Sequence, residues 1–333
     1  MNFIRSIPFP IKLITAVVFL LLSMSFAIRF GAASTSVQDV WNAIWAKNGG
    51  TYYSELREIR FPRVLAAFFV GSALAVAGAI MQGITRNPLA DPGLLGITAG
   101  ANAALAITLA LLPSSSYLQL IIACFIGAGI GMAIVFLIST ATQGGLSPLK
   151  LVLAGAAVTA FLQALADGIG ILFHISKDVS MWTSGGLIGT TWSSLFVVPF
   201  ILIGLTTSLF LSGKLTVLSL NEDVAVGLGQ KTSLLKIILM VLVVILAGSS
   251  VALVGNLAFL GLMIPHMVRA LVGSDYRFIL PMSIVIGGLF MVCADLIGRT
   301  IYAPFETPVV ALISLIGLPF FLILVRKGGR QFE

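Results

Sequence analysis

Charged residues are scarce in this sequence. Of its 333 residues only 9% are Asp, Glu, Lys or Arg, whereas 59% are hydrophobic, and the mean hydropathy is +1.11. An average soluble domain carries about 25% charged residues. A water-soluble chain of this length could not bury so much apolar surface, which excludes a soluble globular fold. A lipid bilayer removes the difficulty, because the bilayer is itself an apolar solvent.

Residues that commonly carry out chemistry are equally scarce. The sequence has two histidines and two cysteines, and it contains no Cys-x-x-Cys, His-Glu-x-x-His or Gly-x-Ser-x-Gly motif. Cys124 and Cys293 lie inside apolar runs, so we expect buried, unpaired thiols. His266 has no carboxylate or thiol neighbour in the sequence, which argues against a metal site. We therefore expect no catalytic residue, no metal and no cofactor.

A phosphate-binding loop is missing as well. The nearest stretch is 227–232, but the lysine of a Walker A loop needs glycine immediately before it and again six residues before it. For Lys231 those two positions are Gln230 and Ala225. ATP hydrolysis, if it drives this protein, is therefore expected on another chain.

Long apolar runs are what the sequence has in abundance. Runs of about 17 to 25 apolar residues mark transmembrane helices, and about ten such runs predict an all-α, polytopic membrane protein. Residues 1–333 are interpreted as one transmembrane domain, with its membrane-spanning bundle over 12–325. The expected spans are 12–30, 64–84, 93–112, 118–140, 149–172, 192–212, 234–254, 257–272, 279–301 and 308–325.

Two of these runs are atypical. Arg5 and Lys12 precede the first run, a pattern that also fits a cleaved signal peptide. We favour a first transmembrane helix, because many spans follow and the charge distribution is consistent with its retention. The eighth run is short and carries Pro265, which predicts a kinked or broken helix.

The net charge of +7 arises from basic residues scattered between the apolar runs. Because they form no single solvated face, a nucleic-acid partner is not expected. With the N-terminus inside, most of the 19 lysines and arginines flank the inner ends of the helices, as the positive-inside rule requires. Both termini are therefore expected in the cytoplasm, and the exception outside is a basic cluster of Arg57, Arg60 and Arg63.

A faint internal repeat relates the second and seventh spans. Its first copy comprises Gly71-Ser72, Ala75, Gly78 and Pro88, which recur at a constant offset as Gly248-Ser249, Ala252, Gly255 and Pro265. A shift by an odd number of helices inverts the second copy, an arrangement found in many transporters. Chance similarity between two helices rich in glycine and alanine is the alternative.

The polar segment 213–233 is predicted to be a cytoplasmic loop that carries a short helix. Asn221 suits an N-cap, and the acidic residues after it suit a first helical turn. Val224 and Leu228 are spaced i, i+4 and give an apolar face that could dock in the groove of a partner. An ordinary structured loop is the alternative. The residues assigned to the docking segment are Asn221, Glu222, Asp223, Ala225, Gly227, Leu228 and Gly229.

Five segments, in order along nearly the whole chain, resemble motifs of the FecCD-type permeases. This family forms the membrane subunits of ABC importers for iron–siderophore, haem and vitamin B12. The segments are Glu58-Ile59-Arg60-Phe61-Pro62-Arg63, the stretch 86–96 that begins Arg86-Asn87-Pro88-Leu89-Ala90, the segment 221–229, the stretch 261–269 that contains Pro265-His266, and Asp295 with Arg299 followed by Glu306-x-Pro308.

The resemblance implies a BtuC-like permease fold with ten transmembrane helices. It implies a two-fold pair with a second permease subunit, either a copy or a paralogue, and a path between the two. Two cytoplasmic ABC ATPases would dock on segment 221–229, and an extracytoplasmic binding protein would deliver the substrate in the cell membrane. A ferric siderophore is the expected substrate, with vitamin B12 or haem as the alternative.

The resemblance also implies roles for single residues. Arg60, Arg63 and Arg299 match arginines that pair with acidic residues of the binding protein. Snorkelling of the first two at a helix start, or an i, i+4 ion pair between Asp295 and Arg299, are the alternatives. Arg269 is expected to face the cytosol.

The segment 176–191 resembles a short gate helix at the mouth of the path, in which glycines could act as hinges. Interface anchoring by its tryptophans is the simpler alternative. The residues predicted to shape turns or the gate are Pro88, Pro265, Gly185 and Gly186.

An ion-coupled secondary transporter would also be helical, but it usually needs acidic groups at mid-membrane. The sequence offers mainly Asp167 and Asp295, both toward helix ends. A membrane-embedded enzyme lacks a catalytic constellation. We therefore favour the ATP-driven importer.

Overall fold

The computed structural model describes residues 7–31, 35–45, 52–141, 148–184 and 186–329. Within these residues the regular structure is helical throughout, which confirms the all-α prediction. One helix corresponds to each predicted span, in the same order. These helices are α2 (Phe9–Arg29), α4 (Phe61–Thr85), α5 (Ile97–Leu111), α6 (Tyr117–Ala141), α7 (Pro148–Leu172), α9 (Val198–Leu220), α11 (Thr232–Val254), α12 (Leu260–Val272), α13 (Tyr276–Thr300) and α14 (Val309–Gly329).

The helices differ in how well their lengths match a bilayer. In the described part of the chain, 7 helices are long and apolar enough to cross a membrane, judged by length and composition. α5, α12 and α14 contribute shorter apolar stretches. Shorter elements connect the long ones: α3 (Val37–Trp45), the π-helix η1 (Glu55–Arg60), the 3-10 turns η2 (Pro92–Leu95) and η3 (Trp192–Val197), α8 (Ser176–Ser184) and α10 (Glu222–Gly227).

Three element boundaries differ from the prediction for local reasons. α5 starts later than expected because the turn η2 precedes it and Gly96, at φ 75°, separates the two. α9 continues to Leu220, so much of the predicted loop 213–233 is helical. α12 is not broken at Pro265, since residues on both sides of it are helical; the break lies before the helix, where Phe259 has φ 67°.

Glycine allows α4 to pack at the centre of the bundle with its neighbours in close contact. A Cβ atom on Gly71 would collide with the backbone carbonyl of Gly287 in α13, and one on Gly78 would collide with Gly261 in α12. Most of α4 is buried as a result. Such close approach replaces the hydrophobic driving force that helices lack in lipid, because it maximises van der Waals contact.

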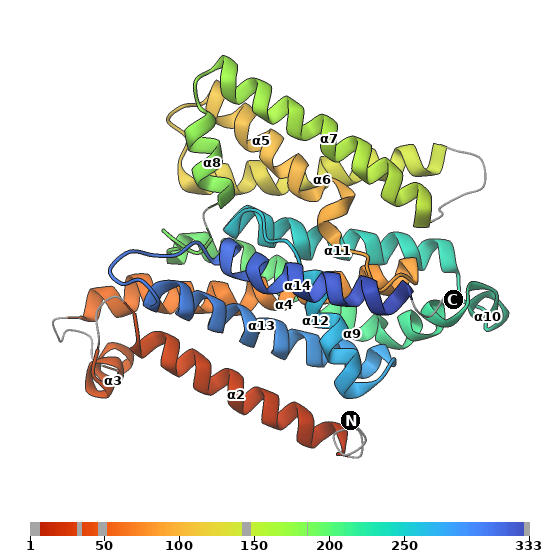
Figure 1. Ribbon diagram of the computed structural model, residues 1–333, viewed down its shortest axis with the longest axis horizontal. Coiled ribbons are helices and arrows are strands. Elements are labelled where there is room, and N and C mark those ends of the chain that lie inside the picture. Colours follow the sequence, from red (N-terminus) through yellow and green to blue (C-terminus); the bar gives the residue numbers. More distant parts are fainter. Residues whose placement is uncertain (1–6, 32–34, 46–51, 142–147, 185, 330–333) are drawn as a thin grey trace.

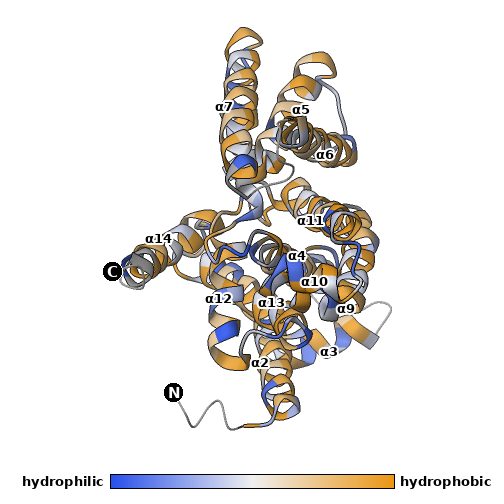
Figure 2. Ribbon diagram, turned by 90° about the vertical axis from the view of Figure 1, so that its right-hand side faces the viewer, coloured by the Kyte–Doolittle hydropathy of each residue, from blue (hydrophilic) through white to orange (hydrophobic). Residues whose placement is uncertain are grey.

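Figure 1 shows how the helices are arranged around α4. α5, α6 and α7 form a layer on one side of α11, whereas α2 lies on the opposite edge beside α13. α10, the start of α2 and the end of α14 lie at one end of the bundle, and α3 and α8 lie at the other end. Figure 2 shows that α7 and α14 stand apart from each other and project from the body of the molecule.

The internal repeat is only partly visible in three dimensions. α4 and α11 pack against each other, but Gly78 lies within α4 whereas its counterpart Gly255 lies just after the end of α11. The inverted repeat therefore stays a prediction. Both cysteines are unpaired as predicted, although only Cys124 is fully buried and Cys293 is half-buried.

Candidate functional site

The end of the bundle where α2 terminates holds a buried network of ion pairs. Arg63, near the start of α4, donates from Nε to Asp295 Oδ1 over 3.0 Å. Its Nη1 and Nη2 donate to the two carboxylate oxygens of Glu306 over 2.8 and 2.9 Å. Arg299 lies one turn after Asp295 on α13 and forms an ion pair with it over 3.1 Å. Asp295 therefore holds two guanidinium groups, and this pairing makes the burial of their charges tolerable.

The same network closes the C-terminal end of α2. Arg60 Nη1 donates to the carbonyl oxygens of Ile28 and Arg29 over 3.1 and 2.9 Å. Arg299 Nη2 donates to the carbonyl oxygen of Ala27 over 3.0 Å. The last carbonyls of a helix have no partner within it, and positive charge there is favourable to the helix dipole. The two arginines thus fix the end of α2 against α4 and α13.

The three arginines predicted to dock a binding protein are buried within this chain. Arg60, Arg63 and Arg299 are 3%, 6% and 4% exposed. The i, i+4 ion pair between Asp295 and Arg299, the alternative for the last of them, is confirmed. Snorkelling does not describe Arg63, whose guanidinium group points into the bundle. A docking role for the three residues stays a prediction.

Other charged groups stand at the rim of this network. Glu55 in η1 pairs with Arg60, and its side chain is about one-third exposed. Arg57 is exposed, donates from Nη1 to the hydroxyl of Tyr53 over 2.6 Å, and lies over that ring. Trp192 donates from Nε1 to the Arg57 carbonyl oxygen over 2.8 Å. The rim therefore presents acidic and basic groups that a partner could contact.

At the opposite end, α10 forms the short helix that the sequence predicts. Asn221 caps it, and its Oδ1 accepts a hydrogen bond from the Asp223 amide over 2.8 Å. Ala225 is buried against the bundle, whereas Val224 and Leu228 are exposed on the helix. Gly229, at φ 78°, turns the chain toward α11. The short helix with an exposed apolar face is confirmed, and its docking function stays a prediction.

Glu222 connects α10 to two other parts of the chain. It pairs with Lys236 of α11 over 2.6 Å and with Arg86, which follows α4, over 3.4 Å. The hydrogen bond from Lys236 is the main reason why the pKa of the Glu222 carboxyl lies below its usual value. A displacement of α10 would therefore act on the segment that Arg86 begins.

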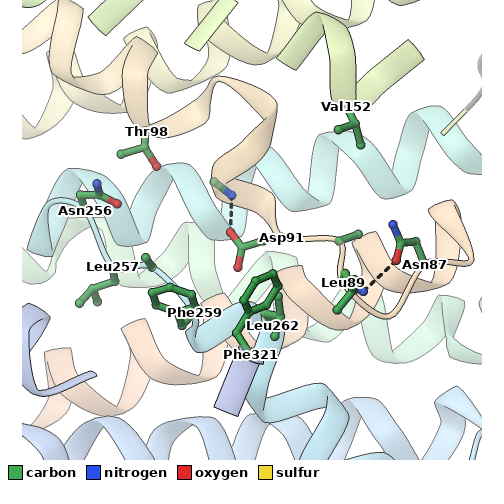
Figure 3. A pocket seen from close by; sticks show the side chains of 13 residues that line it. Asn87, Leu89, Asp91, Thr98, Val152, Asn256, Leu257, Phe259, Leu262 and Phe321 are labelled. Carbon is green, nitrogen blue, oxygen red and sulfur yellow. Dashed lines mark hydrogen bonds between the residues drawn. The ribbon is translucent and has the colours of Figure 1, made fainter. Parts of the chain in front are cut away.

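That segment, residues 86–96, is held in shape by its own side chains. Arg86 ends α4 in the left-handed conformation at φ 52°. Asn87 Oδ1 accepts from the Leu89 amide over 2.9 Å, and Asp91 Oδ1 accepts from the Gly93 amide over 2.7 Å, as Figure 3 shows. Pro88 lies in the turn between them, where a turn was predicted.

A cavity of about 520 Å³ lies beside this segment. Its walls come from residues 87–98, from the break before α12 together with Leu262 in its first turn, and from one residue each of α7 and α14, Val152 and Phe321. Irregular backbone at membrane depth is tolerated where it lines a cavity inside protein. The polar side chains of the wall are Asn87, Asp91, Thr98 and Asn256.

The predicted gate segment is tied to the same break. α8 is the expected short helix, and the Gly186 amide after it donates to the Val254 carbonyl over 3.2 Å. The Asn256 amide donates in turn to the Thr183 carbonyl over 3.3 Å. Gly186 adopts φ 77°, a conformation that favours glycine. Gly185, the other predicted hinge, lies outside the described residues.

The side chain of Arg269, which was expected to face the cytosol, is half-buried, and the side of the membrane on which it lies stays a prediction. Arg269 donates from Nη1 to Gln82 Oε1 and from Nη2 to the Tyr276 hydroxyl, which joins α12 to α4 and α13. His266 packs against the ring of Phe320. Over the described residues, no three His, Cys, Asp or Glu side chains gather where they could hold a metal ion.

Comparison with known proteins identifies the family. The model of the FecCD transport family matches residues 17–327. The chain is 45% identical over 322 residues to the iron(3+)-hydroxamate import system permease protein FhuB of Bacillus subtilis (strain 168), covering 96% of this chain and 84% of that protein. It is 41% identical over 324 residues to the iron-uptake system permease protein FeuB of the same organism, covering 96% and 97% of the two chains.

A solved structure agrees with these relatives. The chain superposes with a TM-score of 0.85 and 28% sequence identity on a metal-chelate type ABC transporter in an inward-facing conformation, covering 96% of this chain and 99% of that one. Sequence and fold therefore agree over almost the whole length. The chain belongs to the FecCD transport family, the non-catalytic permease subunits of ABC transporters, in which a partner ATPase hydrolyses ATP.

Proposed function

We propose that this chain is one of two permease subunits of an importer for ferric siderophores, with both of its termini in the cytoplasm. The observation that carries the substrate class is the 45% identity, over 96% of this chain, to a permease named for iron(3+)-hydroxamate import. The scarcity of carboxylates inside the bundle supports ATP rather than an ion gradient as the source of energy.

The cavity, whose wall carries a few polar side chains, supports the need for a second permease subunit. Asn87, Asp91 and Asn256 line it together with Val152 of α7 and Phe321 of α14, the two helices that stand apart in Figure 2. Polar groups open to hydrocarbon would be costly. A second subunit packed on α7 and α14 would cover this opening and turn it into part of a path between the subunits.

The α10 end supports a docking site for the ATPase. Val224 and Leu228 offer an apolar face to a groove, and Ala225 anchors the helix to the bundle. Glu222 links α10 through Arg86 to the segment that lines the cavity. We infer that movement of the ATPases displaces α10 and, through this ion pair, changes the shape of the cavity wall.

The other end would receive the binding protein. The side chains of Glu55 and Glu306 are each about one-third exposed. They form ion pairs with Arg60 and Arg63, respectively. We infer that acidic residues of the binding protein exchange with these carboxylates, while Arg299 holds the end of α2 in place. The exposed Arg57 would give the first long-range attraction. Because α8 is tied to the cavity wall near Asn256, docking above it could open the path.

Reconstituted transport tests the proposal. The chain, assembled with its partner permease, ATPase and binding protein, is placed in proteoliposomes whose membrane potential has been collapsed with ionophores. ATP-dependent accumulation of a radiolabelled ferric hydroxamate is the expected result. ATP-dependent accumulation of haem or vitamin B12 instead would replace the substrate class. Uptake driven by an ion gradient without the ATPase would overturn the proposal.

A further inference from the structure

The short helix α3 has an apolar face that nothing in the described part of this chain covers. Val37, Trp41, Ile44 and Trp45 are 65%, 64%, 48% and 72% exposed. Their spacing of i, i+4, i+7 and i+8 puts them within roughly 100° of one another around the helix. Ala43, which is buried, points toward the rest of the molecule. The exposed face is therefore an organised surface rather than scattered apolar residues.

The structure fixes where this face lies. Thr35 Oγ1 donates to the Arg29 carbonyl oxygen over 2.8 Å, so α3 starts directly beside the end of α2. Ser36 and Asp39 bond reciprocally: the Ser36 amide donates to Asp39 Oδ2 over 2.9 Å, and the Asp39 amide donates to Ser36 Oγ over 3.1 Å. This capping arrangement sets the start of α3. Figure 1 shows α3 at the end of α2.

The end of α2 marks the boundary of the membrane. Its outward face is apolar along its length, and it closes with Phe26 stacked on Phe30 and with Arg29 over the ring of Phe30. An arginine at the end of a membrane helix reaches the headgroup level with its guanidinium group while its stem lies along apolar surface. α3 therefore begins at the depth where a bilayer passes from hydrocarbon to water.

We propose that α3 lies in the membrane interface, with Trp41 and Trp45 inserted at the level of the phospholipid headgroups. The exposed face continues the lipid-facing surface of α2 at its end, and tryptophan prefers this depth. The only charged residue in α3 is Asp39, which is already bonded to Ser36, so the helix offers no charge to complement a protein partner. Phospholipid is accordingly the occupant that the surface fits.

This placement has a consequence for the neighbouring segment. α3 packs against both α2 and η1, and η1 carries Arg57 and Arg60. A helix anchored in the headgroups would hold η1 at a fixed height above the bilayer. The inference does not depend on the transported substrate or on which side of the membrane this end faces.

Tryptophan fluorescence in nanodiscs formed with a tryptophan-free scaffold protein tests the proposal, because the chain has only 4 tryptophans. In the variant Trp182→Phe/Trp192→Phe, emission comes from Trp41 and Trp45 alone. Lipids brominated close to the headgroup should quench most of this emission. Lipids brominated near the end of the acyl chain should quench it less, and aqueous iodide should quench it little. Strong quenching by iodide without quenching by brominated lipid would overturn the proposal.

Two controls complete the experiment. The converse variant Trp41→Phe/Trp45→Phe keeps the other two tryptophans, and its difference from the unmodified chain gives the same quantity if the first variant does not fold. Both substituted side chains are exposed, so this variant should fold. Repeating the measurement with the binding protein added identifies a protein occupant: protection from iodide that appears only with that protein would also overturn the proposal.

Discussion

At the scale of single residues, Asp295 is the residue of the ion-pair network whose loss should destabilise the protein most. Its side chain is 1% exposed and forms ion pairs with two guanidinium groups, those of Arg63 and Arg299. Glu306 serves only Arg63 and reaches the surface. Removing one partner from a buried ion pair leaves an uncompensated charge, which is far more costly than losing an exposed pair.

The substitutions Asp295→Asn and Glu306→Gln should therefore differ strongly. Asp295→Asn should lower the free energy of unfolding by about 3–5 kcal/mol, or prevent accumulation of the protein. Glu306→Gln should lower it by about 1 kcal/mol or less. Thermal unfolding of the purified chains in detergent measures the difference. Equal melting temperatures for the two variants would contradict the assigned network.

At the scale of elements, the structure of α10 shows which of its exposed apolar residues should contact the ATPase. Leu228 and Val226 are both exposed apolar residues, but only Leu228 shares a face with Val224. If that face docks in the ATPase, Leu228→Ser should weaken ATPase binding by roughly tenfold or more, as for a residue of the interface core. Val226→Ser is the matched control and should change little. Co-purification of the ATPase at graded concentrations gives both affinities, and equal losses would point to another docking face.

The elements also show what the sequence could and could not reveal. Lipid forces each span to be one apolar run with its backbone bonded internally, so the runs located every long helix. The Asp295–Arg299 pair is local, at i, i+4, and could be predicted in the same way. The pairing of Arg63 with Asp295 and Glu306 joins distant parts of the chain, and only packing brings these residues together. For the same reason the arginines matched a docking motif while their burial stayed hidden.

The break before α12 was missed for a different reason. Pro265 is the strongest helix breaker in that run, and the sequence predicted a kink or a break from it. In the structure Pro265 is accommodated within α12, while Phe259 takes a left-handed conformation ahead of it. No local rule favours phenylalanine at positive φ, so tertiary packing decides this position. The preceding Gly255, also at positive φ, was the available signal.

At the scale of the whole molecule, the proposed function divides the apolar surface between lipid and a second subunit. α2 and α7 are both apolar and largely uncovered in the single chain. Of the two, only α7 borders the cavity whose wall carries Asn87, Asp91, Thr98 and Asn256. Burial in the isolated chain therefore does not distinguish the two surfaces, whereas the chemistry beside them does.

A matched pair of substitutions separates these surfaces. Phe161 on α7 is 67% exposed and Phe19 on α2 is 58% exposed, so neither alanine variant should unfold the chain. If the second subunit packs on α7, Phe161→Ala should remove an aromatic contact with it and weaken association of the two permease subunits by about 1–2 kcal/mol. Phe19→Ala exchanges one lipid contact for another and should leave association unchanged. Dilution of the assembled subunits in detergent, followed by light scattering, measures both dissociation constants, and a larger effect at Phe19 would place the second subunit on α2.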